Sequence, residues 1–294
     1  MTIRTLFGAI ALVATASASS LSAQRAPQVA PAGRDSLVIT FLANEGVMLS
    51  SGGTTVLIDA LFGDGLRGYG IVTQPTRTAL ERGQPPFDRV NAVLATHVHN
   101  DHFEARPVFE HLKHNAGATF VSSTEAVRQV RAVDAVATRA MAARLIGIDP
   151  PKAQRVRIAT AGNATIYALG LPHGGRDDVP VNVGFVVDIG GWRVMHVGDG
   201  DVSPAEFASL RLGELGIDVA LLSPHYLTNA GLRDAVRRDI KPTTVAVIHG
   251  PPLGREPGLL DRLRGGWDGV ARDVRREFPN ARLFTRQGET LVVR

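Results

Sequence analysis

Residues 90–102 read VNAVLATHVHNDH, and this stretch joins a buried strand to a dense group of potential metal ligands. The apolar run Val90–Ala95 is typical of a strand that is buried on both faces. Four candidate ligands follow within six residues: His97, His99, Asp101 and His102. His97 and His99 alternate along an extended segment and can point the same way, whereas Asp101 and His102 present a second set of donors. Two adjacent donor sets indicate two metal ions rather than one.

Three later positions complete the arrangement, because each lies at the end of an expected strand and beside a glycine. His173 follows a strand expected over Ala164–Ala168, Asp199 follows one that begins near Trp192, and His249 ends a third apolar run. Each residue taken singly is more often structural than a ligand. Taken together they indicate a metal site, because the neighbouring glycines let the backbone approach a bound ion closely.

The composition excludes several classes of protein. The chain has 294 residues, 44% of them apolar, with a formal net charge of +4, which is typical of a globular protein rather than a disordered one. It contains no cysteine, and this absence excludes disulfides, thiolate metal ligands and a cysteine nucleophile.

The first 23 residues are predicted to be a cleavable signal peptide. Arg4 precedes an apolar stretch from Leu6 to about Ala18, and small residues follow at Ala16-Ser17-Ala18 and at Ala23. A disordered or anchoring N-terminus is the alternative. Residues 24–34 are expected to form a disordered leader and residues 35–294 one catalytic domain. No other stretch reaches the length of a membrane span, so the mature protein is expected to be periplasmic or secreted.

The order of the expected elements is similar in the two halves of the domain, with no sequence repeat and no linker. The expected strands are Leu37–Phe41, Val47–Leu49, Thr54–Ile58, Val90–Ala95, Ala164–Ala168, Asn182–Val187, Trp192–His196, Asp218–Leu222, Thr243–Ile248, Leu283–Phe284 and Thr290–Val293. The expected helices are Ala105–Lys113, Glu125–Val133, Pro204–Leu210, Ala230–Arg238 and Glu256–Phe278. Two long irregular stretches, Phe62–Asp88 and Val133–Arg155, are expected to be functional covers or to carry short helices.

The motif His97-x-His99-x-Asp101-His102 resembles the hallmark of metallo-β-lactamase-fold hydrolases, and the resemblance extends from about Leu37 to the C-terminus. It implies an α/β fold: a four-layer αβ/βα sandwich in which two packed mixed sheets are flanked by helices, with two metals at one edge. It also implies the ligand sets. The first metal would be held by His97, His99 and His173, the second by Asp101, His102 and His249, and Asp199 would bridge them.

Smaller pieces of sequence resemble one branch of this family, the ascorbate-phosphate lactonases and N-acyl-phosphatidylethanolamine phospholipases. These pieces are Leu57-Ile58-Asp59, Gly198-Asp199, Asp218–Leu222 and Ile248-His249-Gly250. Other features depart from related branches. The presence of Asp199 and the absence of cysteine disfavour a true β-lactamase, and His99 favours hydrolysis over di-iron redox chemistry. The small net charge and the lack of an added arm disfavour RNA processing.

The resemblance implies a dinuclear hydrolase with two zinc ions, although manganese, iron or nickel could occupy a mixed His/Asp site, and the predicted signal peptide implies export. A hydroxide formed at the metals would attack a small ester, lactone or amide. A phosphodiesterase or phospholipase is the alternative within catalysis, and a metal-binding protein without turnover is the alternative outside it. All seven predicted ligands are present, which argues against a simple metal buffer. The expected partner is a small-molecule substrate and not a nucleic acid.

Several further polar residues have expected roles outside the set of metal ligands. Asp59 is either an acceptor for the N–H of a ligand imidazole or a residue that ends a strand. His196 is expected to be buried, in a structural or supporting role. His111 and His114 are expected on a solvated helix surface, and Asp201 is expected to cap a helix before Pro204.

His225 and Tyr226 are predicted catalytic residues, in addition to Asp101. Asp218–Leu222 and Thr243–Ile248 flank one expected helix, and such strand–helix–strand units are almost always parallel. Parallel neighbours end at the same edge of a sheet, so His225 is expected near the metals, where it would orient the substrate or protonate the leaving group. The alternative is a histidine that bonds loop backbone.

Overall fold

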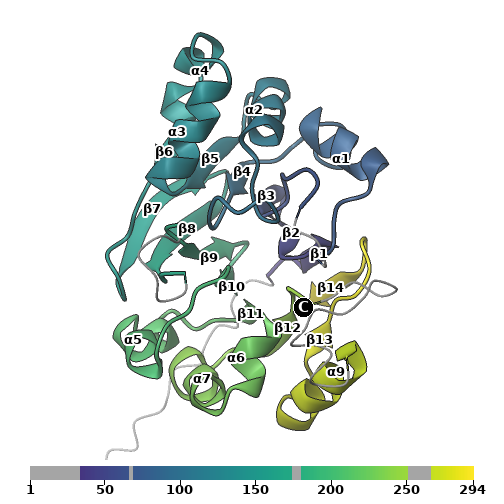
Figure 1. Ribbon diagram of the computed structural model, residues 1–294, viewed down its shortest axis with the longest axis vertical. Coiled ribbons are helices and arrows are strands. Elements are labelled where there is room, and N and C mark those ends of the chain that lie inside the picture. Colours follow the sequence, from purple (N-terminus) through teal and green to yellow (C-terminus); the bar gives the residue numbers. More distant parts are fainter. Residues whose placement is uncertain (1–33, 66–68, 174–179, 251–265) are drawn as a thin grey trace, which may run out of the picture. The chain divides into compact units, whose positions relative to one another are not determined.

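Short strands that are apolar at consecutive positions form the centre of the fold. A computed structural model describes residues 34–65, 69–173, 180–250 and 266–294 (Figure 1). The predicted signal peptide and all but the last residue of the predicted leader lie outside these residues. Residues Arg34–Arg294 form one compact unit.

The first sheet has seven strands in the order β14-β1-β2-β3-β4-β5-β6. Its strands are β1 (Leu37–Ala43), β2 (Gly46–Ser51), β3 (Thr54–Ile58), β4 (Ala92–Leu94), β5 (Thr119–Ser122), β6 (Leu145–Gly147) and β14 (Thr290–Val293). Strands β14 to β3 pair antiparallel, and β3 to β6 pair parallel, so the sheet is mixed.

The second sheet repeats this plan with seven strands in the order β13-β12-β11-β10-β9-β8-β7. Its strands are β7 (Arg155–Ala161), β8 (Ala164–Gly170), β9 (Val183–Ile189), β10 (Trp192–His196), β11 (Val219–Leu222), β12 (Thr244–Val247) and β13 (Arg282–Leu283). Strands β7 to β10 pair antiparallel and β10 to β13 pair parallel. The predicted parallel pairing of β11 with β12 is confirmed.

The parallel strands β4 and β11 have no polar face, because one face packs in the core between the two sheets and the other packs against the outer helices. In β4, Ala92 and Leu94 join the cluster shared by both sheets, whereas Val93 faces the outer helices. In β11, Leu221 faces the other sheet and Leu222 faces outward. Both faces of these strands are buried, so every position is apolar.

Helices cover the outer face of each sheet, and the result is four layers, as predicted (Figure 1). The first sheet carries α1 (Gln74–Glu81), α2 (Ala105–His114), α3 (Thr124–Val133) and the short α4 (Ala137–Ala140). The second carries α5 (Pro204–Ser209), α6 (Pro224–Thr228), α7 (Ala230–Ala235), which continues as a π-helical turn over Val236–Ile240, and α9 (Gly266–Glu277). The part of the expected helix Glu256–Phe278 before residue 266 lies outside the described residues.

Three strands were not expected from the sequence: β5, β6 and β7. β6 is only three residues long and ends on Gly147, and β7 begins where the irregular stretch was expected to end. The two long irregular stretches do carry short helices, α1 in the first and α4 in the second.

Two predictions about polar residues are wrong. His111 is fully buried in α2, and its Nδ1 lies 2.6 Å from the carbonyl oxygen of Leu80 in α1, so it joins two helices instead of facing solvent. Asp201 does not cap α5. Ser203 is the cap: its side chain accepts a hydrogen bond from the backbone N–H of Glu206, whose own side chain bonds the N–H of Ser203.

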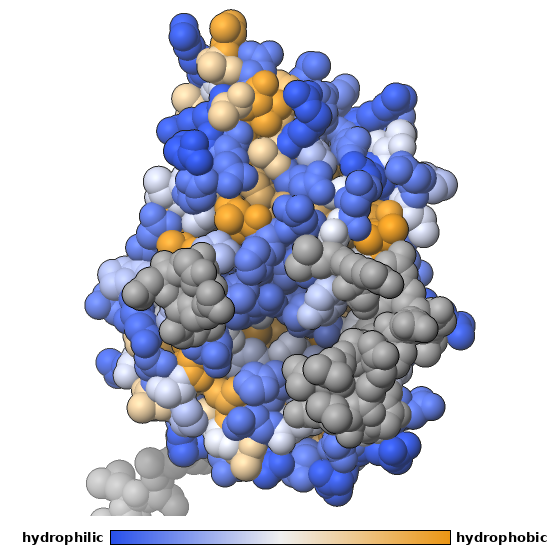
Figure 2. All heavy atoms as spheres, in the orientation of Figure 1, coloured by the Kyte–Doolittle hydropathy of each residue, from blue (hydrophilic) through white to orange (hydrophobic). Residues whose placement is uncertain are grey.

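Four large apolar side chains are exposed among the described residues. They are Ile71, Val136, Val181 and Val292. Hydrophilic residues prevail on the face drawn in Figure 2. None of the described helices has both the length and the apolar character needed to cross a bilayer.

Candidate metal centre

The ends of four strands bring the seven predicted ligands into two groups. In the first group, one donor atom from each of His97, His99, His173 and Asp199 lies within 4.8 Å of every other. The second group contains Asp101, His102 and His249 under the same limit. These residues follow β4, β8, β10 and β12, so residues more than 150 positions apart in the chain meet at one edge of the sandwich.

Asp199 lies between the two groups and turns one carboxylate oxygen toward each. Its Oδ2 is 3.5 Å from Nε2 of His173 and 3.9 Å from Nε2 of His97. Its Oδ1 is 3.5 Å from Nε2 of His102 and 3.7 Å from Nε2 of His249. A carboxylate in this position can bind two cations at once, as the family resemblance implies for Asp199.

Buried polar atoms at this edge lack hydrogen-bond partners among the described residues. They include Oδ1 of Asp101, Nε2 of His102, both ring nitrogens of His173 and Oδ1 of Asp199. Such orphaned atoms are uncommon in folded proteins and often mark an ion or water site. Donors around a tetrahedral zinc lie about 3.4 Å apart, close to the separations around Asp199. The donor set therefore fits metal ions that prefer imidazole and carboxylate.

A carboxylate and a hydroxyl orient the imidazoles that follow β4. Nδ1–H of His102 donates to Oδ2 of Asp59 at 2.8 Å, which is the contact predicted for Asp59. The Thr96 hydroxyl donates to the same oxygen at 2.7 Å and lies 3.0 Å from Nδ1 of His97, so it accepts from that nitrogen. Nε2 of His102 then faces Asp199, whereas Nε2 of His97 lies 2.9 Å from Nδ1 of His99 and 3.9 Å from Oδ2 of Asp199. Thr96 is a supporting residue that the sequence analysis missed, because a threonine at a strand end is an ordinary strand residue.

The pKa shifts agree with these orientations. Burial lowers the pKa of His97 well below its usual range, which keeps the ring neutral, as a metal ligand must be. Burial also lowers the pKa of His102, but Asp199, Asp59 and Glu45 outweigh this effect and raise that pKa to about 10. Burial raises the pKa of Asp199, and the surrounding histidines, led by His249, reverse this and hold it well below its ordinary value.

The turn between β1 and β2 also reaches the centre, which the sequence analysis missed. Nδ2 of Asn44 donates to Oδ2 of Asp101 at 3.0 Å and to its carbonyl oxygen at 3.2 Å, so it orients this ligand. Glu45 is completely buried beside it. A Cβ at Gly46 would lie 2.7 Å from the carbonyl oxygen of Asp59, so only glycine lets the turn pack this closely. Asn-Glu-Gly between two strands has the pattern of a common hairpin turn. The sequence therefore gave no sign that Asn44 and Glu45 lie at the metal centre.

His196 is buried, as predicted, and both of its ring nitrogens are in use. Nε2–H donates to the carbonyl oxygen of Glu45 at 3.0 Å, and Nδ1 accepts from the backbone N–H of Gly198 at 3.1 Å. Burial lowers the pKa of this ring. His196 therefore holds the β1–β2 turn against the loop that carries Asp199 and has no nitrogen left for a metal.

The two catalytic candidates of α6 differ sharply in exposure. His225 is exposed in the first turn of α6, directly after β11. Tyr226 is 1% exposed, and its hydroxyl donates to the carbonyl oxygen of Gly200. A buried hydroxyl that is already bonded to backbone cannot reach a substrate, so the catalytic assignment of Tyr226 is corrected to a structural one.

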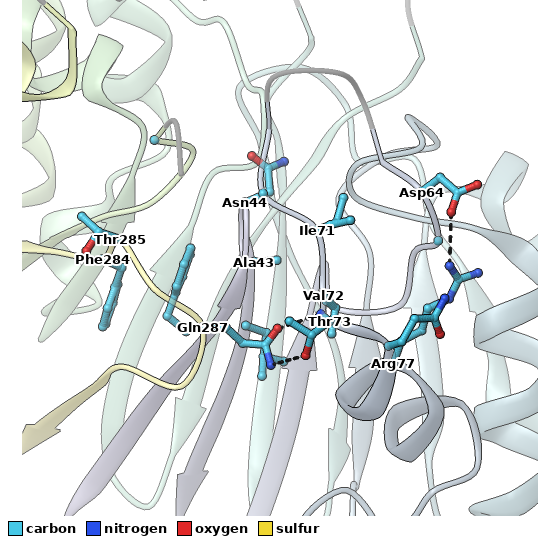
Figure 3. Close-up of a pocket in the computed structure, with 16 residues that line it drawn as sticks. Ala43, Asn44, Asp64, Ile71, Val72, Thr73, Arg77, Phe284, Thr285 and Gln287 are labelled. Carbon is cyan, nitrogen blue, oxygen red and sulfur yellow. Dashed lines mark hydrogen bonds and ion pairs between the residues drawn. The ribbon is translucent and has the colours of Figure 1, made fainter. Parts of the chain in front are cut away.

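A pocket of about 350 Å³ adjoins the centre (Figure 3). Asn44, which orients Asp101, and Gly250, which follows His249, both line it. Much of its wall is apolar: Phe41, Ile71, Val72 and Phe284 contribute side chains. The pocket is therefore shaped by the β1–β2 turn, the segment after β3 and the segment after β13.

The polar side chains of this pocket are largely committed to one another. Nε of Arg77 lies 3.0 Å from Glu81, and Nη1 of Arg77 lies 3.4 Å from Asp64. The amide of Gln287 accepts from the backbone N–H of Thr73 and donates to the Thr73 hydroxyl (Figure 3). It also donates to the hydroxyl of Thr76. Among the described lining residues Arg77 is the cation, and its charge is balanced locally.

The family described as the β-lactamase superfamily domain matches residues 54–249, more than half of the chain. A UPF0173 metal-dependent hydrolase of Thermus thermophilus is 26% identical over 238 residues, which cover 79% of this chain and 92% of that protein. Two solved structures match at the level of the fold. A metallo hydrolase of Ignicoccus hospitalis, Igni18, has a TM-score of 0.54 and 18% identity, covering 88% of this chain and 99% of its own. The metallo-β-lactamase-fold protein YhfI of Bacillus subtilis has a TM-score of 0.57 and 14% identity, covering 88% and 100%. The predicted fold is thereby confirmed.

Proposed function

Because this chain belongs to the β-lactamase superfamily, we propose that it is a metal-dependent hydrolase with a dinuclear centre. The observation that carries the proposal is Asp199, whose two oxygens face two separate groups of imidazole and carboxylate donors. The name of the Thermus thermophilus relative supports the same activity. Zinc is the metal that we propose, because it suits neutral histidine and aspartate without thiolate.

Metal ions held in this way activate water as a nucleophile and stabilise the negative charge that develops on the substrate. The chain itself supplies orientation. Asp59 and Thr96 hold the ring nitrogens of His102 and His97, and Asn44 holds the carboxylate of Asp101. These contacts fix the donors before a substrate arrives, which is the general condition for an efficient metal site.

For the substrate we propose a small, uncharged ester, lactone or amide. The apolar wall and locally balanced charge of the adjoining pocket support this choice over an anionic substrate. The short motifs that resemble the lactonases support a lactone, whereas the same resemblance to the phospholipases supports phosphoryl chemistry. A phosphodiesterase is the second candidate, because the same kind of metal pair serves phosphoryl transfer.

A substrate panel tests this proposal. The zinc-loaded protein should hydrolyse p-nitrophenyl esters or simple lactones with a higher kcat/KM than bis-p-nitrophenyl phosphate. Protein treated with a chelator provides the background rate. Fastest turnover of the phosphate diester would instead favour the phosphodiesterase. If no substrate reacts above the background rate, the result favours a metal-binding protein without turnover.

We also propose that the protein is exported, with residues 1–23 removed as a signal peptide. The support is the sequence alone: a basic start, a short apolar stretch and small residues near Ala18 and Ala23. Expression in a bacterial host with a periplasm should yield a shortened protein in the periplasm or the medium. N-terminal sequencing there should begin near residue 19 or 24, and an intact Met1 in the cytoplasmic fraction would contradict export.

Replacement of His225 by alanine is expected to lower kcat by ~10²–10⁴, the usual contribution of a general acid or base, without loss of metal. The reason is its exposed position at the end of β11, which runs parallel to the strand that precedes His249. The measurement is kcat together with the zinc content. His114→Ala is the matched control, because His114 is also exposed and bonds the carbonyl of its own helix. Unchanged kinetics in His225→Ala would leave His225 with the alternative role of bonding its loop.

A further inference from the structure

We propose that Glu45 is a positioning residue for His249, in the way that Asp59 is for His102. This inference rests on the proposed metal-dependent function. The contact that carries it is the approach of Oε1 of Glu45 to within 3.9 Å of Nδ1 of His249, while Nε2 of the same ring faces Asp199. The carboxylate would accept the Nδ1–H when Nε2 binds a metal ion.

The burial of Glu45 requires a partner of this kind. Its side chain is 0% exposed, and neither oxygen has a hydrogen bond among the described residues. Burial raises the pKa of Glu45 well above its usual range, so its ionised form needs a cation or a strong donor to compensate it. Glu45 lies inside the cluster of metal-ligand candidates, with Asp59 and His102 on one side and Asp199 and His249 on the other.

Three imidazoles lie within 4.0 Å of this carboxylate, and two of them, His102 and His196, hold Nδ1 in hydrogen bonds to other groups. Nδ1 of His102, 4.0 Å from Oε2, donates to Asp59. Nδ1 of His196, 3.8 Å from Oε2, accepts a backbone N–H and has no proton to give. In His249, Nδ1 faces Glu45 and Nε2 faces Asp199, the proposed bridging residue.

The β1–β2 turn also holds the backbone of His249. The N–H of His249 donates to the carbonyl oxygen of Asn44 at 2.9 Å. His249 has φ of +56°, a left-handed conformation that is strained for a residue with a side chain and persists only where its surroundings enforce it. The ring of Tyr69 stacks on the imidazole, with centroids 4.6 Å apart and planes 6° from parallel. The turn, the stacked ring and the strand end therefore act together on one ligand.

The separation of 3.9 Å exceeds a hydrogen bond, so the proposal requires it to shorten when the site is loaded. Bonds within catalytic sites are often long before ligands bind. A carboxylate–imidazole–metal arrangement fixes the ring and increases its basicity, and loss of the carboxylate typically costs 10–100-fold in metal affinity. Glu45 would therefore act on one of the two metals more than on the other.

The test compares Glu45→Ala and Glu45→Gln with the wild-type full-length protein. Zinc affinity is measured by competition with a chromogenic chelator, and the coordination of each site is followed by the absorption spectrum of the cobalt-substituted protein. Glu45→Ala should weaken one of two zinc ions by ~10–100-fold and alter one cobalt site. Glu45→Gln should recover most of this affinity, because its amide oxygen can still accept the Nδ1–H. Glu110→Gln, in an exposed ion-pair network of α2, is the control.

The outcomes separate this inference from the proposed function. If the wild type binds no zinc, the metal-dependent function fails. If it binds two ions and Glu45→Ala binds both with the same affinity and spectrum, only the inference is wrong. If Glu45→Gln loses as much affinity as Glu45→Ala, Glu45 is a direct ligand and the positioning role is rejected. If the alanine variant does not fold, the cobalt spectrum of Glu45→Gln decides: one site should change because the amide lacks the charge that increases the basicity of the ring, and an unchanged spectrum rejects the inference.

Discussion

Replacement of Asp199 by alanine is expected to lower kcat/KM by more than roughly 100-fold, the upper range for loss of a group that only supports a ligand. Asp199 is the one described carboxylate whose two oxygens face both donor groups. Without it, two dications at close range would repel each other with less compensation, and at least one of them should bind weakly. The measurement combines kcat/KM with the zinc content of the purified variant.

Asp201→Ala is the matched control for this experiment. Asp201 lies two residues further along the same loop, is exposed, and does not cap the next helix. It should therefore keep its metals and its activity. If Asp201→Ala removes the metals and Asp199→Ala does not, the bridging role has been assigned to the wrong aspartate.

Removal of the metals is expected to lower the melting temperature by roughly 5–10 °C. A ligand at 100 times its Kd stabilises the folded state by about 2.7 kcal/mol, and each kcal/mol corresponds to about 2–4 °C in a domain of this size. The physical reason is that the donors converge at one buried edge, where polar atoms lack other partners. The measurement is thermal unfolding before and after chelation, followed by addition of zinc.

The same samples give the metal stoichiometry. About two ions per chain are expected after reconstitution with zinc, as two donor groups imply. Chelator that has been saturated with zinc beforehand is the control, because it should leave the melting temperature unchanged. Fewer than one ion per chain at neutral pH would exclude the dinuclear assignment.

Residues near one another in the chain were the easiest to predict. Metal ligands could be predicted after β4, because four potential donors follow an apolar strand within one short segment. The strand β11 was equally clear, since a strand buried on both faces is apolar at consecutive positions. The edge strands β6 and β7 were missed, since their residues satisfy no comparable burial pattern.

Two of the predictions that failed concern burial, which depends on distant parts of the chain. His111 was expected at the surface because its helix alone has a polar appearance, yet α1 covers it. Tyr226 was expected at the substrate because it follows β11, yet its side chain turns inward to Gly200. In each case the decisive neighbour is 25 or more residues away in sequence.

The sequence by itself determined most of the strands, the donor types and the positions of the seven candidate ligands, because these follow from local patterns of apolar and polar residues. Only the tertiary structure decided which residues surround those ligands. Glu45 and Asn44 lie in an ordinary hairpin turn, and they reach the centre because the turn packs against Asp59 and the end of β12. The physical reason is that hydrogen bonds and buried charges act across space, between segments that the packing of two sheets brings together.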